Sequence, residues 1–322
     1  QLWSKVVRAG NDPRRERDKG KAKTLTFEEV ARICHRDAIA PGLSNEKHIK
    51  QWIGSLEKYV FPKIGRLPIN TVVQEDIINL LTPIWASKNE TASRTLQRIR
   101  RVFDWARPRA DCSLGSRMNP AEIPRDVLPN IRKSEKNHRA ALPYKELPKL
   151  MRQLREVTAI SGHALRFHIL TVSRPNETRG AKWSEIDFQK RLWTIPAERM
   201  KGRRLHEVPL SDAAIEILRG VEGLSDKFVF PSISDPKKVM SDSTMNLVLV
   251  RLGVSRAKAT VHGFRSTFRV WAEEQTDAAY EVKEMALAHA LRNKVEAAYN
   301  RTSLLDKRRV LMDQWAEFAI GK

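Results

Sequence analysis

A proline-rich, charged segment divides this sequence into two parts with different patterns of hydrophobic residues. It covers residues 124–143 and carries the basic side chains of Arg132, Lys133, Lys136 and Arg139. Such a composition is typical of a linker between domains, because few contacts cross a boundary of this kind. The 322 residues also exceed what one hydrophobic core usually serves. We therefore expect two domains.

The part before the linker carries only helical patterns. Thr26 followed by Glu29 forms a capping box, which predicts the start of a first helix. Apolar residues at three- and four-residue spacing predict further helices. These cover residues 49–60, 74–85 and 91–106. Pro83 should bend or end the second of them. We expect an all-helical domain over residues 25–130.

The part after the linker mixes helices with a small amount of strand. Helical patterns cover residues 144–154 and 164–170, and they resume from residue 211. Between them, residues 193–196 and 206–210 predict two short strands joined by a basic turn around Lys201. The expected fold class is therefore mainly α with a small β-sheet. The expected segments are residues 1–24, 25–130, 131–142 and 143–322, with a tail helix at the end.

The charge balance predicts a polyanionic partner. Lys and Arg number 59 against 38 Asp and Glu, a formal net charge of +21. Neutralising phosphates releases condensed counterions and drives binding. Arg94, Arg98 and Arg101 share one side of a predicted helix. A solvated basic face is one interpretation of that side, and a helix lying along a DNA groove is the other, which the overall charge favours.

Cysteine usage and hydropathy disfavour a disulfide-rich, a zinc-binding or a membrane-spanning protein. Cys34 and Cys112 lie far apart with no CxxC motif, so neither a disulfide framework nor a zinc site is predicted. The sequence has no apolar run long enough to cross a membrane and no signal peptide. We expect a cytoplasmic protein without a membrane partner. Because the first residue is Gln1 rather than Met, we expect part of the natural N-terminus to be missing.

The second part also contains short motifs that suit phosphate chemistry. Arg174 precedes Glu177 by three residues, and a guanidinium donates two hydrogen bonds to phosphate oxygens. Lys201 lies among the basic residues of the turn, next to Arg203 and Arg204. A lysine there can give up a proton, whereas arginine holds its proton too tightly. Taken singly, such motifs are more often a surface ion pair and a solvated turn.

Two further motifs complete an ordered set. His262 and Arg265 stand three residues apart, so both can face one phosphate from one side of a helix. No third ligand lies near enough in the sequence to suggest a metal site. His289 precedes Tyr299, which stands among alanines. A lone HisxxArg pair or such a tyrosine is usually structural, but six such residues in order are improbable by chance.

As a set, these residues resemble the active site of the tyrosine recombinases, the phage integrase family. The sequences of residues 183–187, 193–201 and 299–301 most resemble those of integrases from genomic islands and phage satellites. The resemblance is strong from about residue 141 to the end, and mainly architectural over residues 26–130. Members normally begin with a small arm-site DNA-binding domain, of which residues 1–24 would hold only the tail and a basic linker.

The resemblance implies a helical core-DNA-binding domain of the SAM-like type, followed by an α+β catalytic domain. In the catalytic domain, Arg174, Arg265 and His289 would bind the scissile phosphate and stabilise its growing charge. His262 would assist as an acid/base or positioning group. The family cuts and rejoins DNA without metal or other cofactor. Arg203 and Arg204 would contact DNA beside the catalytic lysine.

Covalent chemistry follows from the same resemblance. Tyr299 would attack phosphorus and form a 3′-phosphotyrosine, while Lys201 protonates the leaving 5′-oxygen. The implied outcome is site-specific integration or excision of a mobile element. The implied partners are double-stranded DNA attachment sites, a homotetramer on that DNA and an accessory DNA-bending protein. The implied location is the nucleoid of a bacterial host.

Two rival functions and one structural question stay open. A type IB topoisomerase shares the chemistry but relaxes supercoils alone, and a sequence-specific DNA-binding protein would carry a vestigial pocket. A metal-dependent nuclease is disfavoured, because no carboxylate cluster stands out. The tail has an apolar face after Tyr299 that docks either on its own domain or on a neighbouring protomer. The apolar residues of that face are Leu304, Leu305, Val310, Leu311, Trp315 and Phe318.

Overall fold

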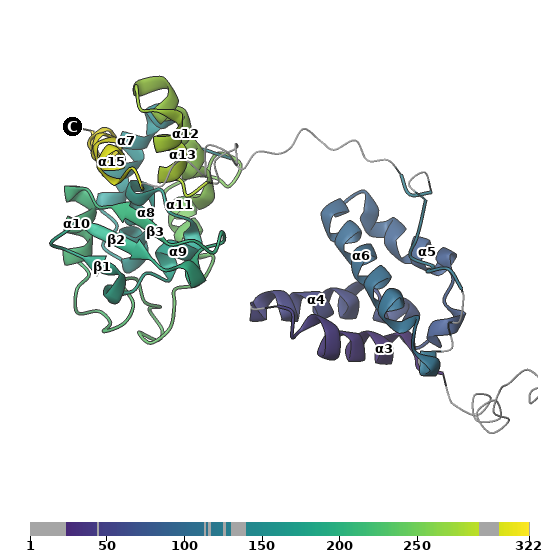
Figure 1. The fold of residues 1–322 in the computed structure, drawn as a ribbon. Helices are drawn as coiled ribbons and strands as arrows, with labels where there is room; N and C mark the ends of the chain where they lie inside the picture. Colours follow the sequence, from purple (N-terminus) through teal and green to yellow (C-terminus); the bar gives the residue numbers. More distant parts are fainter. Residues whose placement is uncertain are drawn as a thin grey trace, which may run out of the picture. The chain divides into compact units, whose positions relative to one another are not determined.

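The structure is a computed structural model that describes residues 24–43, 45–112, 114, 117–124, 127–129, 140–289 and 303–321. The chain divides into two compact units, Gln1–Glu135 and Lys136–Lys322 (Figure 1). Each unit has a hydrophobic core of its own. The two units are therefore separate domains by their packing.

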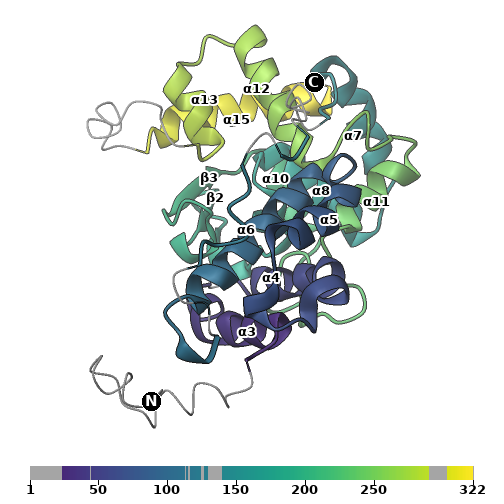
Figure 2. The ribbon, with the colours of Figure 1, turned by 90° about the vertical axis from the view of Figure 1, so that its right-hand side faces the viewer.

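The described first unit is built from helices (Figure 2). Its α-helices are α3 (Phe27–Cys34), α4 (Glu46–Tyr59), α5 (Gln74–Trp85) and α6 (Asn89–Ala106). Its shorter turns are η1 (His35–Ile39), η2 (Phe61–Gly65), η3 (Ile69–Thr71) and η4 (Ala110–Cys112). The helix expected over residues 74–85 is confirmed with those bounds, and Pro83 lies within its last turn. The helix expected over residues 91–106 begins two residues earlier, at Asn89.

The capping box at the start of α3 is confirmed. Thr26 Oγ1 accepts from the Glu29 backbone N–H at 3.3 Å, and the Thr26 N–H donates to Glu29 Oε2 at 2.7 Å. This pair satisfies backbone groups that a helix start leaves free. The helix then buries Phe27 against Phe103, with ring centroids 5.6 Å apart. The cap therefore sets the helix that carries a central residue of this core.

Cys34 and Cys112 both lie in the first unit as free, buried thiols. Burial raises the pKa of each thiol to about 11. A thiol with a raised pKa carries little thiolate at neutral pH, and the thiolate is the reactive form. These cysteines therefore serve as packing residues.

The second unit surrounds a small antiparallel sheet with helices. Its strands are β1 (Ile186–Asp187), β2 (Leu192–Ile195) and β3 (His206–Pro209), in the order β1-β2-β3. Its α-helices are α7 (Leu147–Arg155), α8 (Ile160–Thr171), α9 (Pro175–Arg179), α10 (Asp212–Arg219), α11 (Thr244–Arg251), α12 (Phe264–Gln275), α13 (Tyr280–Ala286) and α15 (Leu305–Ile320). Its shorter turns are η5 (Tyr144–Glu146), η6 (Trp183–Glu185), η7 (Ala197–Arg199) and η8 (Val261–Gly263). The expected mainly α fold with a small sheet is confirmed.

The sheet differs from the expectation in two details. We expected two strands, and β1 adds a third by pairing Ile186 with Trp193. A two-residue strand is too short to show alternation in the sequence. The connection between β2 and β3 is also longer than a tight turn, because η7 interrupts it before residues 200–205. The basic turn therefore follows a short helical turn, η7, instead of joining the two strands directly.

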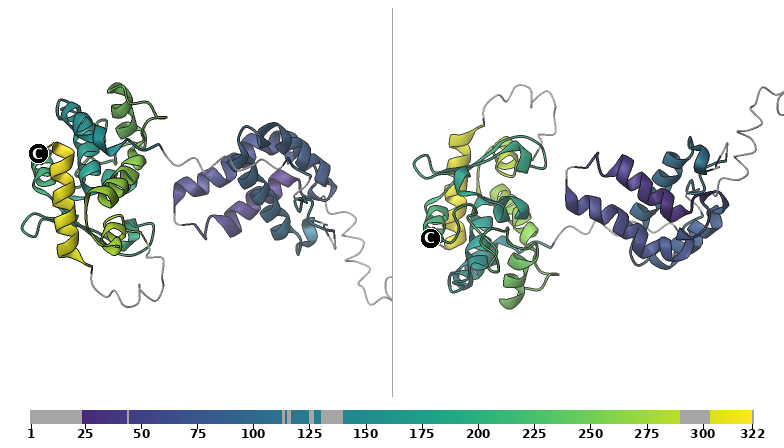
Figure 3. Two further views of the ribbon diagram at one scale, coloured as in Figure 1. Left: turned by 90° about the horizontal axis from the view of Figure 1, so that it is seen from above. Right: turned by 90° about the horizontal axis from the view of Figure 1, so that it is seen from below.

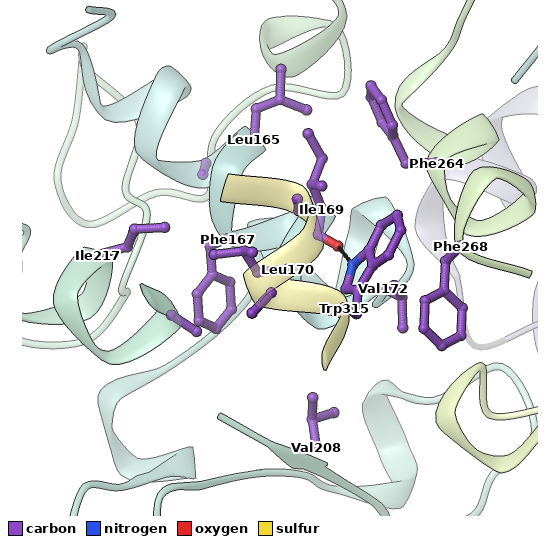
Figure 4. Close-up of a cluster of buried hydrophobic side chains, with 14 of the residues drawn as sticks. Leu165, Phe167, Ile169, Leu170, Val172, Val208, Ile217, Phe264, Phe268 and Trp315 are labelled. Carbon is purple, nitrogen blue, oxygen red and sulfur yellow. Dashed lines mark hydrogen bonds between the residues drawn. The ribbon is translucent and has the colours of Figure 1, made fainter. Parts of the chain in front are cut away.

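Helix α8 is the centre of the second core, because it packs against α7, α10, α11 and α15. Most of its residues are buried, including Leu165, Phe167 and Ile169 (Figure 4). Helix α15, drawn in yellow in Figure 3, lies along this unit. It inserts Trp315, whose Nε1–H donates to the Ile169 carbonyl at 2.8 Å. The tail helix therefore docks on its own unit and belongs to the core.

Among the residues that the structure describes, no helix combines the length and the apolar character that a bilayer crossing requires.

Candidate active site

The site begins where α8 ends and α9 starts. Val172 caps α8 in the left-handed conformation, with φ 45°, which is strained for a β-branched residue. The chain then turns so that Arg174 precedes Pro175, the first residue of α9. Glu177 holds Arg174 twice: its carboxylate accepts from the Arg174 N–H at 2.7 Å and from Nη1 at 2.9 Å. Because Glu177 is buried, the guanidinium is fixed to the start of this helix.

Arg265 lies in the first turn of α12 and is buried. Its Nη1 donates to the Val172 carbonyl and its Nη2 to the Leu287 carbonyl. Burial, with a contribution from nearby Arg174, lowers the pKa of Arg265 to about 10, so the guanidinium stays charged at neutral pH. Among the described residues its hydrogen bonds all go to neutral acceptors. A phosphate placed here would therefore meet a charge that no carboxylate neutralises directly.

His289 reaches the two arginines through the way α13 ends. Ala288 is left-handed, with φ 49°, and the His289 N–H bonds back to the Glu284 carbonyl at 3.0 Å. With the Ala288 N–H on the Met285 carbonyl at 3.0 Å, these bonds form a Schellman motif. The Ala288 carbonyl accepts from Arg174 Nη2 at 3.0 Å, and His289 Nε2 lies 3.2 Å from Arg265 Nη2. The ends of α8 and α13 and the start of α12 therefore bring Arg174, Arg265 and His289 together.

The electrostatics of His289 follow from these neighbours. Burial lowers its pKa, the arginines lower it further, and the hydrogen bond to Glu284 opposes them. Burial alone would raise the pKa of Glu284, but hydrogen bonds from Arg269 and His289 outweigh burial and lower it. Glu284 is therefore ionised, and its Oε2 accepts a hydrogen bond from His289 Nδ1 at 2.9 Å.

His262 lies one turn before Arg265, but in η8 rather than in α12 itself. Thr260 caps this turn, since its Oγ1 accepts from the Gly263 N–H at 3.1 Å. A Cβ on Gly263 would lie 2.0 Å from the Ala140 carbonyl oxygen, so only glycine fits there. His262 is half-buried. The close approach of the Ala140 backbone to Gly263 therefore fixes the turn that carries His262.

The loop that carries Lys201 is exposed, together with Arg203 and Arg204. Its base is anchored by Met200, which is buried in the core. Among the described contacts, none joins Lys201 to Arg174, Arg265 or His289. Lys201 therefore lies on an exposed loop, outside the hydrogen bonds that join those three residues.

Tyr299 lies outside the described residues, as do all of residues 290–302. The chain leaves the site at His289 and is described again from residue 303, just before α15. The nucleophile therefore stays a prediction from the sequence.

The arginines of α6 differ in their surroundings. Arg94 is exposed and pairs with Glu90, with Nε 2.7 Å from Oε1. Arg101 is exposed. Arg98 is half-buried and donates from Nη1 to the Gln51 carbonyl at 2.9 Å and to a serine hydroxyl of α4. Arg101 therefore offers its charge to solvent, Arg94 shares its charge with Glu90 on the exposed surface, and Arg98 joins α6 to α4.

Sequence reasoning missed two polar residues near the site, the partly buried Glu284 and the buried His206. Glu284 escaped notice because Ala288, where a glycine would have signalled a helix end, hides the Schellman turn. His206 of β3 is buried, and burial, followed by the charges of Arg308, Arg265 and Arg174, lowers its pKa to about 3. No signal in the sequence distinguishes it. Within the described residues, no group of three His, Cys, Asp or Glu side chains could hold a metal ion.

Two family models match the sequence. The model of the phage integrase central domain matches residues 27–120, and the model of the phage integrase family matches residues 141–304. The chain belongs to the phage integrase family. The resemblance drawn from the six motif residues is thereby confirmed at the level of the family.

Individual integrases are similar to much of the chain. Prophage integrase IntA of Escherichia coli K12 is 35% identical over 82% of this chain, and the integrase of Enterobacteria phage P4 is 32% identical over 98%. The chain spans 63% of the length of IntA and 74% of that of the P4 integrase. A lambda integrase tetramer bound to a Holliday junction has a similar fold, with a TM-score of 0.65 and 16% identity, over 90% of this chain and 87% of that one.

Proposed function

We propose that this chain is the core-binding and catalytic part of a site-specific tyrosine recombinase that acts on double-stranded DNA. One observation carries the proposal: Arg174, Arg265 and His289 meet from three separate elements, with Arg265 Nη2 3.2 Å from His289 Nε2. Two guanidinium groups and an imidazole in one place suit a phosphate that gains negative charge in its transition state. The net charge of +21 supports a DNA partner.

The reaction is a transesterification, in which the phosphoryl group passes from O5′ of the DNA to the oxygen of a tyrosine. Tyr299 Oη forms a bond to phosphorus as the P–O5′ bond breaks, and the strand becomes a 3′-phosphotyrosine. Lys201 Nζ gives its proton to the departing O5′, and the phenolic proton passes to a base or to water. His262 assists as an acid/base or positioning group. Attack by a 5′-hydroxyl of another strand reverses these steps.

The assembly would be four protomers on paired attachment sites, with an accessory protein that bends the DNA. The solved lambda integrase tetramer on a Holliday junction supports such an arrangement by its similar fold. Arg94, Arg101, Arg203 and Arg204 are exposed and would meet DNA phosphates. A bacterial nucleoid is the place where such a protein would work.

Covalent trapping tests the proposal. The protein is mixed in EDTA with end-labelled nicked duplexes that tile candidate attachment sites, and products are run on a denaturing gel. A slow, protease-sensitive labelled band that Tyr299→Phe abolishes is the expected result. Tyr280→Phe is the matched control, because Tyr280 is an exposed tyrosine of α13 and its ring stacking with Arg269 survives the change.

Other outcomes favour the rival functions. Tight, salt-sensitive binding without any band would favour a DNA-binding protein with a vestigial pocket. Relaxation of any supercoiled plasmid by the protein alone would favour a topoisomerase. A requirement for divalent metal would contradict the tyrosine mechanism outright.

A further inference from the structure

A buried carboxylate lies beneath the loop that carries Lys201. Glu185, in η6, has a side chain only 6% exposed. Its Oε2 accepts from Trp193 Nε1 of β2 at 3.0 Å, from the Lys182 N–H at 3.3 Å, and from Arg199 Nη1. Burying this charge is tolerable only because an arginine pairs with it. Arg199 is thus fixed to the sheet.

The same guanidinium also reaches the other side of the site. Arg199 Nη2 donates to the carbonyl of Glu177, the residue whose carboxylate holds Arg174. Gly180 leaves the space for this contact, because a Cβ there would lie 2.9 Å from Arg199 Nη2. Arg199 therefore links η6 and β2 to α9, and it ends η7 two residues before Lys201.

We propose that Arg199 is a positioning residue that acts through Lys201, an inference that rests on the proposed function. The bonds of Arg199 fix the base of an otherwise exposed loop relative to the helix that begins at Arg174. Lysine is a flexible point charge, so proton delivery depends on where its backbone is held. A misplacement of about 1 Å can slow an enzyme by about 100-fold.

The step in which Lys201 acts transfers one proton. In the cleavage step the P–O5′ bond breaks and O5′ takes a proton from Lys201 Nζ. If the oxygen is replaced by a 5′-bridging sulfur, the leaving thiolate needs no proton. A defect in proton delivery is then rescued by sulfur, whereas a defect in phosphate binding is not. This difference separates a role through Lys201 from a general structural role.

The kinetic test compares nicked duplexes with 5′-oxygen or 5′-sulfur at the bond where trapping occurs. Arg199→Ala should cleave the oxygen substrate at least ~10-fold more slowly than the unaltered chain, and the sulfur substrate within a few-fold. Lys201→Ala should show the same pattern, with a larger loss of cleavage rate on the oxygen substrate, of order 100-fold. Arg174→Lys should cleave both substrates slowly, because sulfur does not restore phosphate binding. Arg219→Ala, which alters an exposed arginine of α10, should change neither.

A second test needs no DNA. Limited trypsin digestion with mass spectrometry should detect cleavage after Lys201, Arg203 and Arg204 several-fold faster in Arg199→Ala than in the unaltered chain, at similar melting temperature. Glu185→Gln and Gly180→Ala provide milder variants in case Arg199→Ala folds poorly. Gln keeps an oxygen for Trp193, and a Cβ at position 180 meets the guanidinium tip at 2.9 Å and, less tightly, the Asn176 carbonyl oxygen at 3.3 Å. Both should accelerate the same cuts.

The outcomes are separable. Equal slowing of Arg199→Ala on oxygen and sulfur substrates would overturn the proposal, and so would full activity on both. Unchanged trypsin cutting in all three variants would also overturn it, whatever the DNA experiments give. If the unaltered chain forms no covalent complex with either substrate, the proposed function fails, while the trypsin result still decides whether Arg199 holds the loop.

Discussion

Glu284 and His289 are joined twice, through the backbone at 3.0 Å and through the side chains at 2.9 Å. The ionised carboxylate can only accept, so Nδ1 of the imidazole carries a proton. In the neutral ring Nε2 is then an acceptor, and Arg265 Nη2 lies 3.2 Å from it. To donate to a phosphate oxygen, Nε2 needs a proton of its own. Glu284 therefore supports the charged imidazolium that phosphate binding requires.

Changing Glu284 to Gln removes this support. The hydrogen bond to Glu284 raises the pKa of His289, so its loss should lower that pKa further. Cleavage at pH 7 should fall by about 10- to 100-fold, the worth of a charged hydrogen bond, and should recover as the pH is lowered. NMR titration of His289 and a pH–rate profile check both points. Glu281→Gln, on the same helix, is the control, and an unmoved His289 titration would refute the argument.

The buried histidine of α8 predicts a loss of stability in mild acid. His168 lies between Thr178 Oγ1 and the Val261 carbonyl, and burial lowers its pKa to about 3. The unfolded chain binds its proton near pH 6.5, while the folded chain does so only near pH 3. Stability is therefore full above pH 6.5 and falls as the pH drops from 6.5 toward 3, by about 2 kcal/mol at pH 5.

Hydrogen exchange measures this loss within the second unit alone. The free energy of exchange of α8 amides, corrected for the intrinsic rate, should fall between pH 7 and pH 5. His206 adds to the loss in the same direction, since burial also lowers its pKa to about 3. A flat profile over this range would show that His168 is protonated without cost in the folded chain.

Much of the fold was predictable because helical periodicity is a local property. The helix over residues 74–85 and the cap at Thr26 were fixed by spacing and side-chain chemistry within a few residues. The pairing of Arg174 with Glu177 also lies within one turn, and the sequence analysis considered it only as a surface ion pair, whereas Glu177 is buried. The family was recognisable for the same reason, since its motifs are short.

The remainder depended on contacts between distant segments. Strand β1 exists because Ile186 meets Trp193. Arg199 looked like any basic residue before a turn, and only its contacts with Glu185 and the Glu177 carbonyl single it out. Arg98 matched its neighbours in sequence, although its partner, the Gln51 carbonyl, lies on another helix. Tyr299 stays a prediction, because it lies outside the described residues.

Ala288 predicts a substitution that stabilises the second unit. Its φ of 49° costs an L-residue about 1–2 kcal/mol, which glycine avoids. Ala288→Gly should therefore raise the stability of α13 by about 1 kcal/mol, as measured by hydrogen exchange. Ala286→Gly should act in the opposite direction, because it loosens the helix and removes a buried methyl group. Destabilisation by Ala288→Gly would mean that the left-handed turn carries no strain.

Trp315 predicts the cost of disturbing the tail helix. Its side chain is fully buried, and its ring centroid lies 5.3 Å from that of Phe268. Trp315→Ala should destabilise the second unit by about 3–5 kcal/mol, whereas Val310→Ala, at an exposed position, should change little. Melting curves check the pair. Deleting residues 310–322 should consequently impair folding itself, and a deletion variant with unchanged melting would show that α15 is dispensable.

Arg98 and Arg101 predict two separable effects from two arginines of one helix. Arg98 bonds to the Gln51 carbonyl, so Arg98→Ala should destabilise the first unit by about 1–3 kcal/mol. Arg101 is exposed, so Arg101→Ala should leave stability unchanged. If Arg101 meets one phosphate, its loss should reduce the slope of log affinity against log salt by about 1. Titrations of generic duplex DNA at several salt concentrations, beside melting curves, measure both. An unchanged slope for Arg101→Ala would place the DNA contact on another face of the unit.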